Sequence, residues 1–456
     1  MTPYDVVIVG LGTGGQTAAF RLSEQGLKVA VAERSDRLGG TCALAGCQPK
    51  KWFYEVAESM AKSRHLLGKG LETLPRTAWA AIRRQKNQFT AGIPAGTRES
   101  LAEAGIDLIA GSARFQDHET LQVSGRQLKA PCFILATGAR PMPLPIDGFP
   151  HLITSDDFLE LDTLPPKILF VGGGFISFEF AHFAARLGPQ GGRVIILEVE
   201  SRPLGPFDAD MVDLLVKASA EAGIEIHTGT RIEAVTPMNG GYRVSTAAGA
   251  SFEVDLVVHG AGRSPELAGL NLEAGGVTYS AKGIEVDARL RTSNPRVFAV
   301  GDCIASPQLA RLADLEAHVA AENILAERSH TQAVTMNYGA VPSILFTYPQ
   351  YGMVGQTEQA LKRQGIPYTR SFAHNLQWPT YTRIGLKHAA YKILVGADRG
   401  ILGGHILADS ASGLINTLKL AMVNGIRADS LHRQSILSPY PTRESDLAYM
   451  LEDFLP

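Results

Sequence analysis

Cys42 and Cys47 are the side chains of this sequence with the clearest capacity for chemistry. They stand five residues apart in residues 39–51, which read GGTCALAGCQPKK. In a regular helix this spacing places the two Cα atoms roughly 8–9 Å apart, whereas a disulfide usually needs less than about 7 Å. A bridge would therefore require a distorted first turn, which Gly46 permits, and a strained bridge is easier to reduce than a structural one. A helix N-terminus and the lysines that follow are expected to lower the pKa of these thiols.

Two buried thiols, or half of a metal site, are the alternative interpretations of this pair. A C-x4-C pair is poor zinc spacing, and no second cysteine pair lies nearby. The other cysteines are Cys132 and Cys303, which we expect to be small structural residues. We therefore interpret Cys42 and Cys47 as a redox pair, and we predict no metal site.

A glycine-rich turn near the N-terminus is suited to a dinucleotide. Gly10, Gly12 and Gly15 follow an apolar run at residues 5–9 and precede a stretch compatible with a helix. Such a turn lets the backbone approach a pyrophosphate, and the helix N-terminus supplies amide donors. Glu33 lies 18 residues after Gly15, close to the spacing at which a carboxylate accepts hydrogen bonds from ribose hydroxyls.

The same arrangement recurs about 160 residues later in the chain. Gly172 and Gly174 follow the apolar run at residues 168–171, and Ser177 stands where the third glycine would be. Serine is small enough for close packing between helix and strand, so we interpret the segment as a variant of the same turn. Glu198 ends the next strand, and an acid there favours a free ribose 2′-hydroxyl over a 2′-phosphate. The sequence therefore predicts NADH in preference to NADPH.

Length and composition describe an ordinary globular chain. The 456 residues suggest about three domains. Hydrophobic residues make up 45%, which excludes a disordered chain, and the net charge of −2 gives no sign of nucleic acid binding or of an anionic membrane surface. The sequence predicts no signal peptide and no membrane span. Four cysteines are too few for a disulfide-stapled secreted scaffold, so we expect a reducing, cytoplasmic location.

The order of the expected strands and helices predicts an α/β fold with two Rossmann-like dinucleotide-binding domains and a C-terminal α+β domain. A proline-rich connector at residues 141–145 marks the first boundary. We divide the chain into a first dinucleotide-binding domain formed by residues 1–147 and 275–335, a second at residues 148–274, and a C-terminal domain at residues 336–456.

Together these segments resemble the class I FAD-dependent pyridine nucleotide-disulfide oxidoreductases, the family of glutathione reductase, dihydrolipoamide dehydrogenase and mercuric reductase. The resemblance covers nearly the whole chain. Besides the cysteine segment and the two turns, it includes short motifs at residues 136–141, 262–265 and 301–302, and the FTYP motif at residues 346–349 that opens the family's dimerisation domain.

The resemblance implies FAD in the first domain, a nicotinamide dinucleotide in the second, and a homodimer in which the partner subunit completes the active site. The implied cofactor-binding positions are Gly10, Gly12, Gly15, Glu33, Gly40, Thr41, Lys50, Lys51, Ala113, Thr137, Gly138, Gly172, Gly174, Ser177, Glu198, Gly262, Asp302 and Ala310.

The resemblance also implies catalytic roles. Cys47 is implied to be the flavin-proximal charge-transfer thiol, and Cys42 the interchange thiol that meets substrate. A lysine after the second cysteine, here Lys50 or Lys51, is implied to pair with Glu179 near flavin N5. The charges there would stabilise the flavin anion that develops during hydride transfer.

The chain departs from the family near its C-terminus. The family's reductases usually carry a His-Pro-Thr-x-x-Glu motif whose histidine is the acid/base, but here Tyr440 stands at the histidine position and Ser445 at the glutamate position. Tyrosine is a poor base at neutral pH and a usable hydrogen-bond donor. We take Tyr440 and the neighbouring Glu444 as candidate catalytic residues. Mercuric reductases also have tyrosine there, but this chain lacks their C-terminal cysteine pair.

The sequence therefore predicts an FAD enzyme that uses NADH to reduce a disulfide, persulfide or soft metal ion through the cysteine pair. Two alternatives remain. One is an oxidase or quinone reductase that does not use the cysteines. The other is a non-catalytic sensor of the NADH/NAD ratio.

Overall fold

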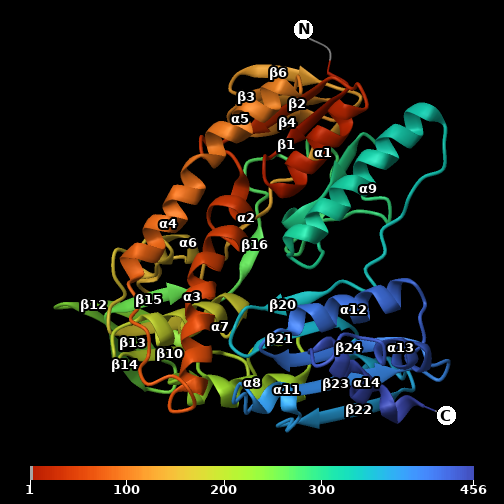
Figure 1. The fold of residues 1–456 in the computed structure, drawn as a ribbon. Coiled ribbons are helices and arrows are strands. Elements are labelled where there is room, and N and C mark those ends of the chain that lie inside the picture. Colours follow the sequence, from red (N-terminus) through yellow and green to blue (C-terminus); the bar gives the residue numbers. More distant parts are fainter. Residues whose placement is uncertain (1–3, 456) are drawn as a thin grey trace. The chain divides into compact units, whose positions relative to one another are not determined.

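A computed structural model describes residues 4–455 and divides them into two compact units (Figure 1). The first unit consists of residues 4–52, 83–142 and 262–337, and the second of residues 53–82, 143–261 and 338–455. Helices α3 (Cys47–Leu66) and α4 (Trp79–Ala91) contribute residues to both units. Within residues 4–455, no helix combines the length and apolar character needed to cross a membrane.

The first unit is built on a parallel sheet of five strands in the order β3-β2-β1-β7-β19. Its strands are almost continuously apolar, because helices cover a parallel sheet on both faces. They are β1 (Val6–Val9), β2 (Val29–Glu33), β3 (Asp107–Ala110), β7 (Cys132–Leu135) and β19 (Val297–Ala299).

Helices α1 (Thr13–Glu24) and α9 (Ala310–Ser329) pack side by side in this unit (Figure 1). The remaining elements of the unit are helices α2 (Gly40–Leu44) and α5 (Ile93–Glu103), an antiparallel sheet of β4 (Ala113–Asp117), β5 (Thr120–Val123) and β6 (Arg126–Lys129), and the pairs β8 (Ala139–Pro141) with β16 (Arg263–Pro265) and β17 (Tyr279–Ser280) with β18 (Gly283–Ile284).

The second unit contains a parallel sheet with the equivalent order β11-β10-β9-β15. Its strands are β9 (Lys167–Val171), β10 (Arg193–Leu197), β11 (Ile224–His227) and β15 (Leu256–His259), and its helices are α6 (Ser155–Phe158), α7 (Phe175–Leu187) and α8 (Ala209–Glu221). An antiparallel sheet of β12 (Ile232–Met238), β13 (Gly241–Thr246) and β14 (Ser251–Val254) is inserted before β15.

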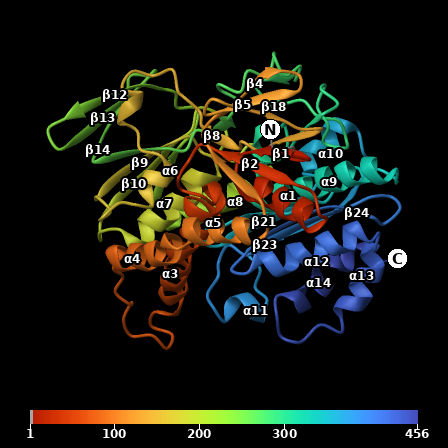
Figure 2. The ribbon, with the colours of Figure 1, turned by 90° about the horizontal axis from the view of Figure 1, so that it is seen from above.

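The C-terminal part of the second unit is an antiparallel sheet in the order β20-β21-β24-β23-β22. Helix α12 (Ala411–Val423) packs on β21 and β24 of this sheet, and Figure 2 shows it beside α13 (Ala428–Ser435) and α14 (Leu447–Leu451). The strands are β20 (Ser343–Leu345), β21 (Gln350–Gly355), β22 (Thr369–His374), β23 (Ala390–Val395) and β24 (Ile401–Ala408), with short helices α10 (Glu358–Gln364) and α11 (Pro379–Thr382).

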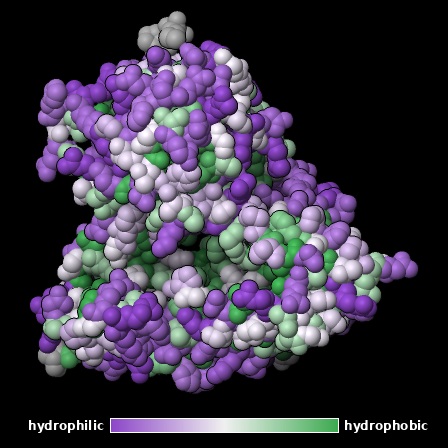
Figure 3. All heavy atoms as spheres, turned by 180° about the vertical axis from the view of Figure 1, so that it is seen from behind, coloured by the Kyte–Doolittle hydropathy of each residue, from purple (hydrophilic) through white to green (hydrophobic). Residues whose placement is uncertain are grey.

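These elements confirm the predicted α/β class with two Rossmann-like sheets and a C-terminal α+β region. The face drawn in Figure 3 is largely covered by hydrophilic residues. The most exposed of the large apolar side chains of the C-terminal region are Leu420, Val423, Ile436, Leu437 and Tyr440.

Candidate active site

The first glycine-rich turn connects β1 to α1 and leaves room for a ligand at one glycine only. A Cβ atom at Gly10 would lie 2.4 Å from the Ala136 carbonyl oxygen, and one at Gly15 would lie 2.0 Å from the Gly10 carbonyl oxygen. A Cβ at Gly12 would meet no atom of the described residues within 4 Å. Gly10 and Gly15 therefore permit tight packing, whereas Gly12 faces open space where a pyrophosphate fits.

The start of α1 is prepared for an anion. No side chain of the described residues caps the N-terminus of this 12-residue helix, so its first amide groups are available to a phosphate. Glu33, at the end of β2, accepts hydrogen bonds from the backbone amides of Leu11 at 2.7 Å and Ser35 at 2.8 Å. The carboxylate therefore lies beside the turn, as the spacing from Gly15 predicts.

The cysteine pair lies where two helices are separated by a break. Helix α2 ends at Leu44, Ala45 leaves helical geometry with φ −143°, and Cys47 is the first residue of α3. A Cβ at Gly46 would lie 3.0 Å from the Thr41 carbonyl oxygen, so a glycine suits this break. Cys42 and Cys47 are thiols here, and a hydrogen bond joins their side chains. The break brings the two sulfurs together, which a regular helix would not do.

The charges around Cys42 differ from the expectation. Its pKa is raised, first by the hydrogen bond to Cys47 and then by burial. The charges of Cys47 and Asp314 raise the pKa further, and that of Arg311 lowers it; Asp314 and Arg311 are on α9. The prediction that lysines and a helix terminus lower the pKa is therefore wrong for Cys42. Asp314 accepts hydrogen bonds from Thr13 at 2.5 Å and Thr17 at 3.1 Å, and no sequence motif marks it.

Several other predicted cofactor positions gather at the carboxyl ends of the same parallel strands. Thr137 and Gly138 follow β7, Asp302 follows β19, and Ala310 is the first residue of α9. A Cβ at Gly40 would lie 2.5 Å from the Gly12 Cα, so residues 39–41 cross the glycine-rich turn closely. Burial raises the pKa of Asp302.

Two predicted positions lie on smaller elements of the first unit. Ala113 is buried at the start of β4, and Gly262, with φ +106°, precedes β16. β16 pairs with β8, and through this pairing the Glu266 amide donates to the Gly138 carbonyl at 2.8 Å. Lys50 and Lys51 lie in the first turns of α3.

The second glycine-rich turn, between β9 and α7, repeats the first with one exchange. A Cβ at Gly172 would lie 2.5 Å from the Ala261 Cα. Ser177 is fully buried, and a Cβ at Gly260 would lie 2.0 Å from its hydroxyl oxygen. The glycine needed for close packing is therefore on the strand side, at Gly260. Glu198 accepts from the amides of Gly173 at 2.6 Å and Glu200 at 2.8 Å.

Gly174 immediately precedes α7, and no described side chain caps the N-terminus of this helix. Glu179 lies one turn further on. It is 1% exposed and accepts a hydrogen bond from the Phe346 amide at 2.9 Å. A buried, hydrogen-bonded carboxylate on the nicotinamide-type helix fits the role implied for Glu179.

The C-terminal motif does not form a tyrosine–carboxylate dyad among the described residues. Tyr440 is 73% exposed, and Ser445 bonds back to Thr442 through both its hydroxyl and its amide. Arg443 makes a bidentate pair with Asp409, with contacts of 2.7 and 3.1 Å. Glu444 begins a 3-10 turn, Glu444–Asp446. The Arg443–Asp409 pair carries no local sequence signal, because its members are 34 residues apart.

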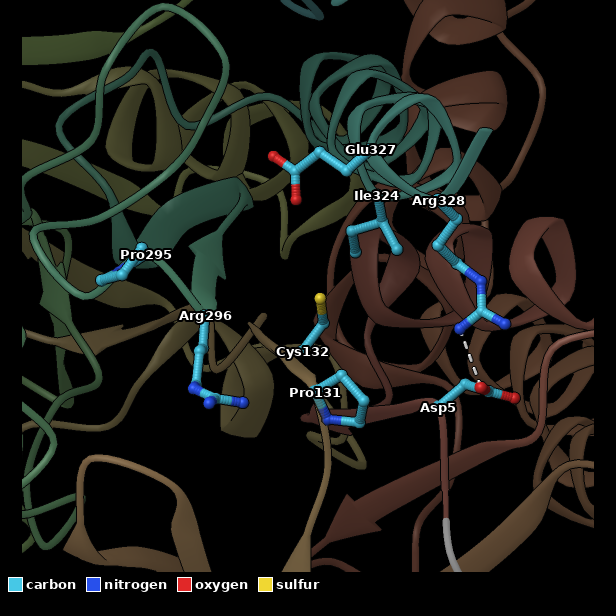
Figure 4. Close-up of a pocket in the computed structure, with 8 residues that line it drawn as sticks. All are labelled: Asp5, Pro131, Cys132, Pro295, Arg296, Ile324, Glu327 and Arg328. Carbon is cyan, nitrogen blue, oxygen red and sulfur yellow. Dashed lines mark hydrogen bonds and ion pairs between the residues drawn. The ribbon is translucent and has the colours of Figure 1, made fainter. Parts of the chain in front are cut away.

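The remaining cysteines lie apart from this chemistry. Cys303 is buried and donates to the Val300 carbonyl, and burial raises its pKa to about 11. Cys132 is only half-buried and points into a cavity of about 320 Å³ (Figure 4). Asp5, Cys132 and Arg296 line this cavity at the starts of β1, β7 and β19, at the edge of the sheet opposite to the glycine-rich turn. No group of three or more potential ligands among the described residues is placed to hold a metal ion.

Comparison with protein families identifies both parts of the chain. Residues 4–317 match the pyridine nucleotide-disulphide oxidoreductase family, and residues 341–449 match the dimerisation domain of pyridine nucleotide-disulphide oxidoreductases.

Curated relatives of full length include several reductases. The chain is 30% identical to dihydrolipoyl dehydrogenase 3 of Pseudomonas putida over 98% of this chain and 97% of the relative. It is 29% identical to glutathione reductase of Burkholderia cepacia over 96% of each. It is also 29% identical to mercuric reductase of Staphylococcus aureus over 97% of this chain and 81% of the relative.

Among solved structures, the chain is similar to the HOCl-induced flavoprotein disulfide reductase RclA of Escherichia coli. A Cu(II) complex of a cysteine-to-serine mutant of that protein has 25% identity and a TM-score of 0.87, over 99% of both chains. A second structure of RclA has 25% identity and a TM-score of 0.86, over 98% of this chain and 99% of the other.

Proposed function

This chain belongs to the pyridine nucleotide-disulfide oxidoreductase family and is an FAD-dependent enzyme, and we propose that it uses NADH to reduce a Cys42–Cys47 disulfide and then a thiol-reactive acceptor. The observation that carries the proposal is the break between α2 and α3, which places the two sulfurs within hydrogen-bonding reach of each other. We assign FAD binding to residues 1–147 and 275–335, NADH binding to residues 148–274, and subunit contact to residues 336–456.

The first glycine-rich turn fits FAD, because Gly12 opens onto free space and α1 lacks a capping side chain. Its residues Gly10, Gly12, Gly15 and Glu33, with Asp302 and Ala310, would hold the cofactor. A bound FAD would supply the two-electron redox chemistry that links the nicotinamide to the disulfide. The residues of the chain bind it, orient it and provide charge.

The cysteines carry the second half of the proposed reaction. Two electrons and two protons convert the Cys42–Cys47 disulfide into two thiols. For a disulfide acceptor, the Cys42 thiolate attacks one sulfur and releases the other as a thiol. Cys47 then attacks Cys42, restores the bridge and releases the second product thiol. The helix N-terminus at Cys47 favours negative charge on its sulfur.

Charged and hydroxyl groups support this chemistry in the proposal. We assign Lys50 or Lys51, together with Glu179, to charge balance beside the flavin, as the family resemblance implies. We assign Tyr440 as a hydrogen-bond donor to the acceptor, and Glu444, four residues further on, as a candidate catalytic carboxylate. Tyrosine in place of histidine favours an acceptor whose reduction needs little proton transfer from the protein.

A soft metal ion is the acceptor class that these features favour. Two Cu(II) ions would take up the two electrons of the thiol pair and become Cu(I), while the Cys42–Cys47 disulfide reforms and two protons are released. No leaving thiol has to be protonated, so this acceptor does not need the missing histidine. One of the RclA structures is a Cu(II) complex, and RclA matches this chain along almost its full length. We therefore rank Cu(II) ahead of low-molecular-weight disulfides and persulfides.

The preference for NADH rests on Glu198. Its carboxylate lies at the end of β10, beside the second turn, where it accepts hydrogen bonds from a ribose and repels a 2′-phosphate. A higher kcat/KM for NADPH than for NADH would contradict this assignment.

The proposed assembly is a homodimer. The family's dimerisation domain covers residues 341–449, and this region carries the exposed side chains of Leu420, Val423, Ile436 and Leu437. Burial of this apolar surface against a second copy would be favourable. A reducing compartment such as the cytoplasm suits a cycle that regenerates thiols.

An anaerobic titration of the FAD-loaded enzyme with NADH tests the proposal. We expect long-wavelength absorbance from a thiolate next to the flavin and, on alkylation, new modification at Cys42 and Cys47. Cys42→Ser should abolish turnover of Cu(II) and of disulfides, whereas the matched control Cys132→Ser should retain it. Full turnover by Cys42→Ser would instead favour an oxidase or quinone reductase that does not use the pair.

A further inference from the structure

Helix α7 carries a row of three buried polar side chains, of which the proposed reaction uses only Glu179. Glu179, His182 and Arg186 follow one another at spacings of three and four residues, so they share one face of the helix. All three are less than 9% exposed. The face they form lies against residues 346–348, which belong to the FTYP motif and precede β21.

Each of the three side chains makes a hydrogen bond to the backbone of that segment. The Phe346 amide donates to Glu179, and the Tyr348 amide donates to His182 Nδ1 at 3.2 Å. Arg186 donates to the Tyr348 carbonyl oxygen at 2.9 Å. The amide and the carbonyl of Tyr348 are thus both bound by side chains of α7, in place of a partner strand.

These contacts fix the tautomer of His182. Nδ1 accepts hydrogen bonds from Tyr348 and from Arg186, the latter at 2.7 Å. The proton must therefore be on Nε2, which donates to the Ser219 hydroxyl at 2.9 Å. Ser219 in turn donates to the Leu215 carbonyl on α8. Burial and the charge of Arg186 hold the pKa of His182 well below its usual value, so the ring is neutral.

Arg186 is an unusual group to bury. Within residues 4–455, no carboxylate lies within 4 Å of its guanidinium, and its partners are the neutral imidazole and carbonyl oxygens. Burial lowers its pKa to about 10. Glu58 and Arg186 line one small gap in the packing, but Glu58 Oε1 is bound by Tyr54 and Lys62. A desolvated guanidinium without a counter-ion is a poor source of stability, which points to a geometric role.

We propose that His182 and Arg186 are positioning residues that lock α7 against residues 346–348 and thereby fix the position of the Glu179 carboxylate. The lock ties the helix that begins at the nicotinamide turn to the first residues of the dimerisation region. This inference rests on the role proposed above for Glu179.

The test measures the rate of flavin reduction by NADH in the FAD-loaded enzyme by stopped flow. Arg186→Met keeps an apolar side chain of similar length and removes the guanidinium group with its hydrogen-bond donors. We expect it to slow flavin reduction by about tenfold, because the Glu179 carboxylate would no longer be held in its position beside the flavin. KM for NADH should change less than about twofold. Arg186→Lys keeps the positive charge but loses the planar guanidinium group, and we expect an intermediate rate of flavin reduction.

His182 provides a paired comparison within the same lock. Asn at position 182 can place an acceptor where Nδ1 lies, so His182→Asn should stay close to wild type. His182→Phe removes the acceptor and should slow reduction as Arg186→Met does. Arg193→Met is the matched control, because it breaks only an exposed pair with Glu225 on the same unit.

Hydrogen exchange of a peptide covering residues 343–348 gives a readout independent of activity. We expect faster exchange in Arg186→Met and His182→Phe, and no change in the Arg193→Met control. Slow flavin reduction without faster exchange would overturn the lock. So would wild-type reduction rates in both variants, or equal slowing in Arg193→Met.

Glu179→Gln separates this inference from the proposed function. If Glu179→Gln slows flavin reduction and Arg186→Met does not, the lock is wrong and the role of Glu179 stands. If Glu179→Gln reduces at the wild-type rate, the role of Glu179 fails and the lock has no catalytic purpose. If Arg186→Met does not fold, the two His182 variants decide the question by the same measurements.

Discussion

In both dinucleotide units a helix packs closely against the end of a strand, but the glycine that allows this is on the helix in one unit and on the strand side in the other. In the first unit, Gly15 on α1 faces Ala136 at the end of β7. In the second, Ser177 on α7 faces Gly260 at the end of β15. Where helix and strand approach most closely, one partner must lack a side chain, and either element can supply it. The third glycine of the motif is therefore one half of a pair rather than a fixed position.

The two acids show the opposite behaviour, because they are the same in every contact. Glu33 is the last residue of β2, and Glu198 is the residue after β10. Each accepts one hydrogen bond from an amide of the turn and one from the amide two residues further on. The acid, which is expected to face the ligand, is thus the same in both units, whereas the glycine that packs in the protein interior changes from the helix to the strand side.

Gly15→Ala should have the largest effect in this comparison. The new Cβ would lie 2.0 Å from the Gly10 carbonyl oxygen, and backbone cannot move aside as a side chain can. We expect a loss of about 3 kcal/mol in unfolding free energy, together with loss of bound FAD. Denaturant unfolding and the flavin absorbance per protein measure both, and full FAD occupancy would contradict this account of the turn.

Gly260→Ala should be the next most damaging change, at about 1–3 kcal/mol, because its Cβ would meet the Ser177 hydroxyl. The double variant Ser177→Gly/Gly260→Ala recreates the pairing of the first unit and should recover most of that loss. Unfolding free energies of the two single variants and the double variant form the required cycle. Additive losses would show that the exchange is coincidental.

Neutralising either acid should affect the binding of only one of the two cofactors. Glu198→Gln should raise KM for NADH by about tenfold, because a charge-assisted hydrogen bond contributes about 1.5 kcal/mol or more, and should leave FAD content unchanged. Glu33→Gln should weaken FAD retention and spare KM for NADH. Steady-state kinetics and flavin content test both, and crossed effects would refute the assignment of cofactors to units.

Ser177→Ala should have the smallest effect. The hydroxyl of Ser177 is buried without a hydrogen-bond partner among the described residues, so its removal leaves no donor or acceptor unsatisfied. We expect a change within about 0.5 kcal/mol, in the stabilising direction. A clear loss of stability would show that the hydroxyl is bound by a group outside residues 4–455, such as a cofactor or a water molecule.

The sequence was sufficient for the parts of the fold that depend on local pattern. Buried parallel strands give continuous apolar runs, so β1, β9 and the acids that end β2 and β10 follow from the sequence alone. The break at Gly46 also follows, because five residues of regular helix place two cysteines too far apart to meet.

The contacts that need distant partners could not be predicted in this way. Nothing near Ser177 indicates that Gly260 supplies the missing glycine. Nothing near Cys42 indicates that Asp314 and Arg311, about 270 residues away, act on its pKa. The lysines close in sequence were the natural expectation, and tertiary structure replaced them with charges from α9. The same limit applies to Arg443 and Asp409.

The position of β19 has a consequence for the order in which the chain can fold during synthesis. The first parallel sheet needs Val297–Ala299 to pair with β7, so its edge remains open until residue 299 has left the ribosome. The second sheet lies entirely within residues 167–259 and can close earlier. The N-terminal sheet is therefore completed after the one that follows it in sequence, and the apolar strand β7 has an unpaired edge for longer, which exposes the nascent chain to aggregation.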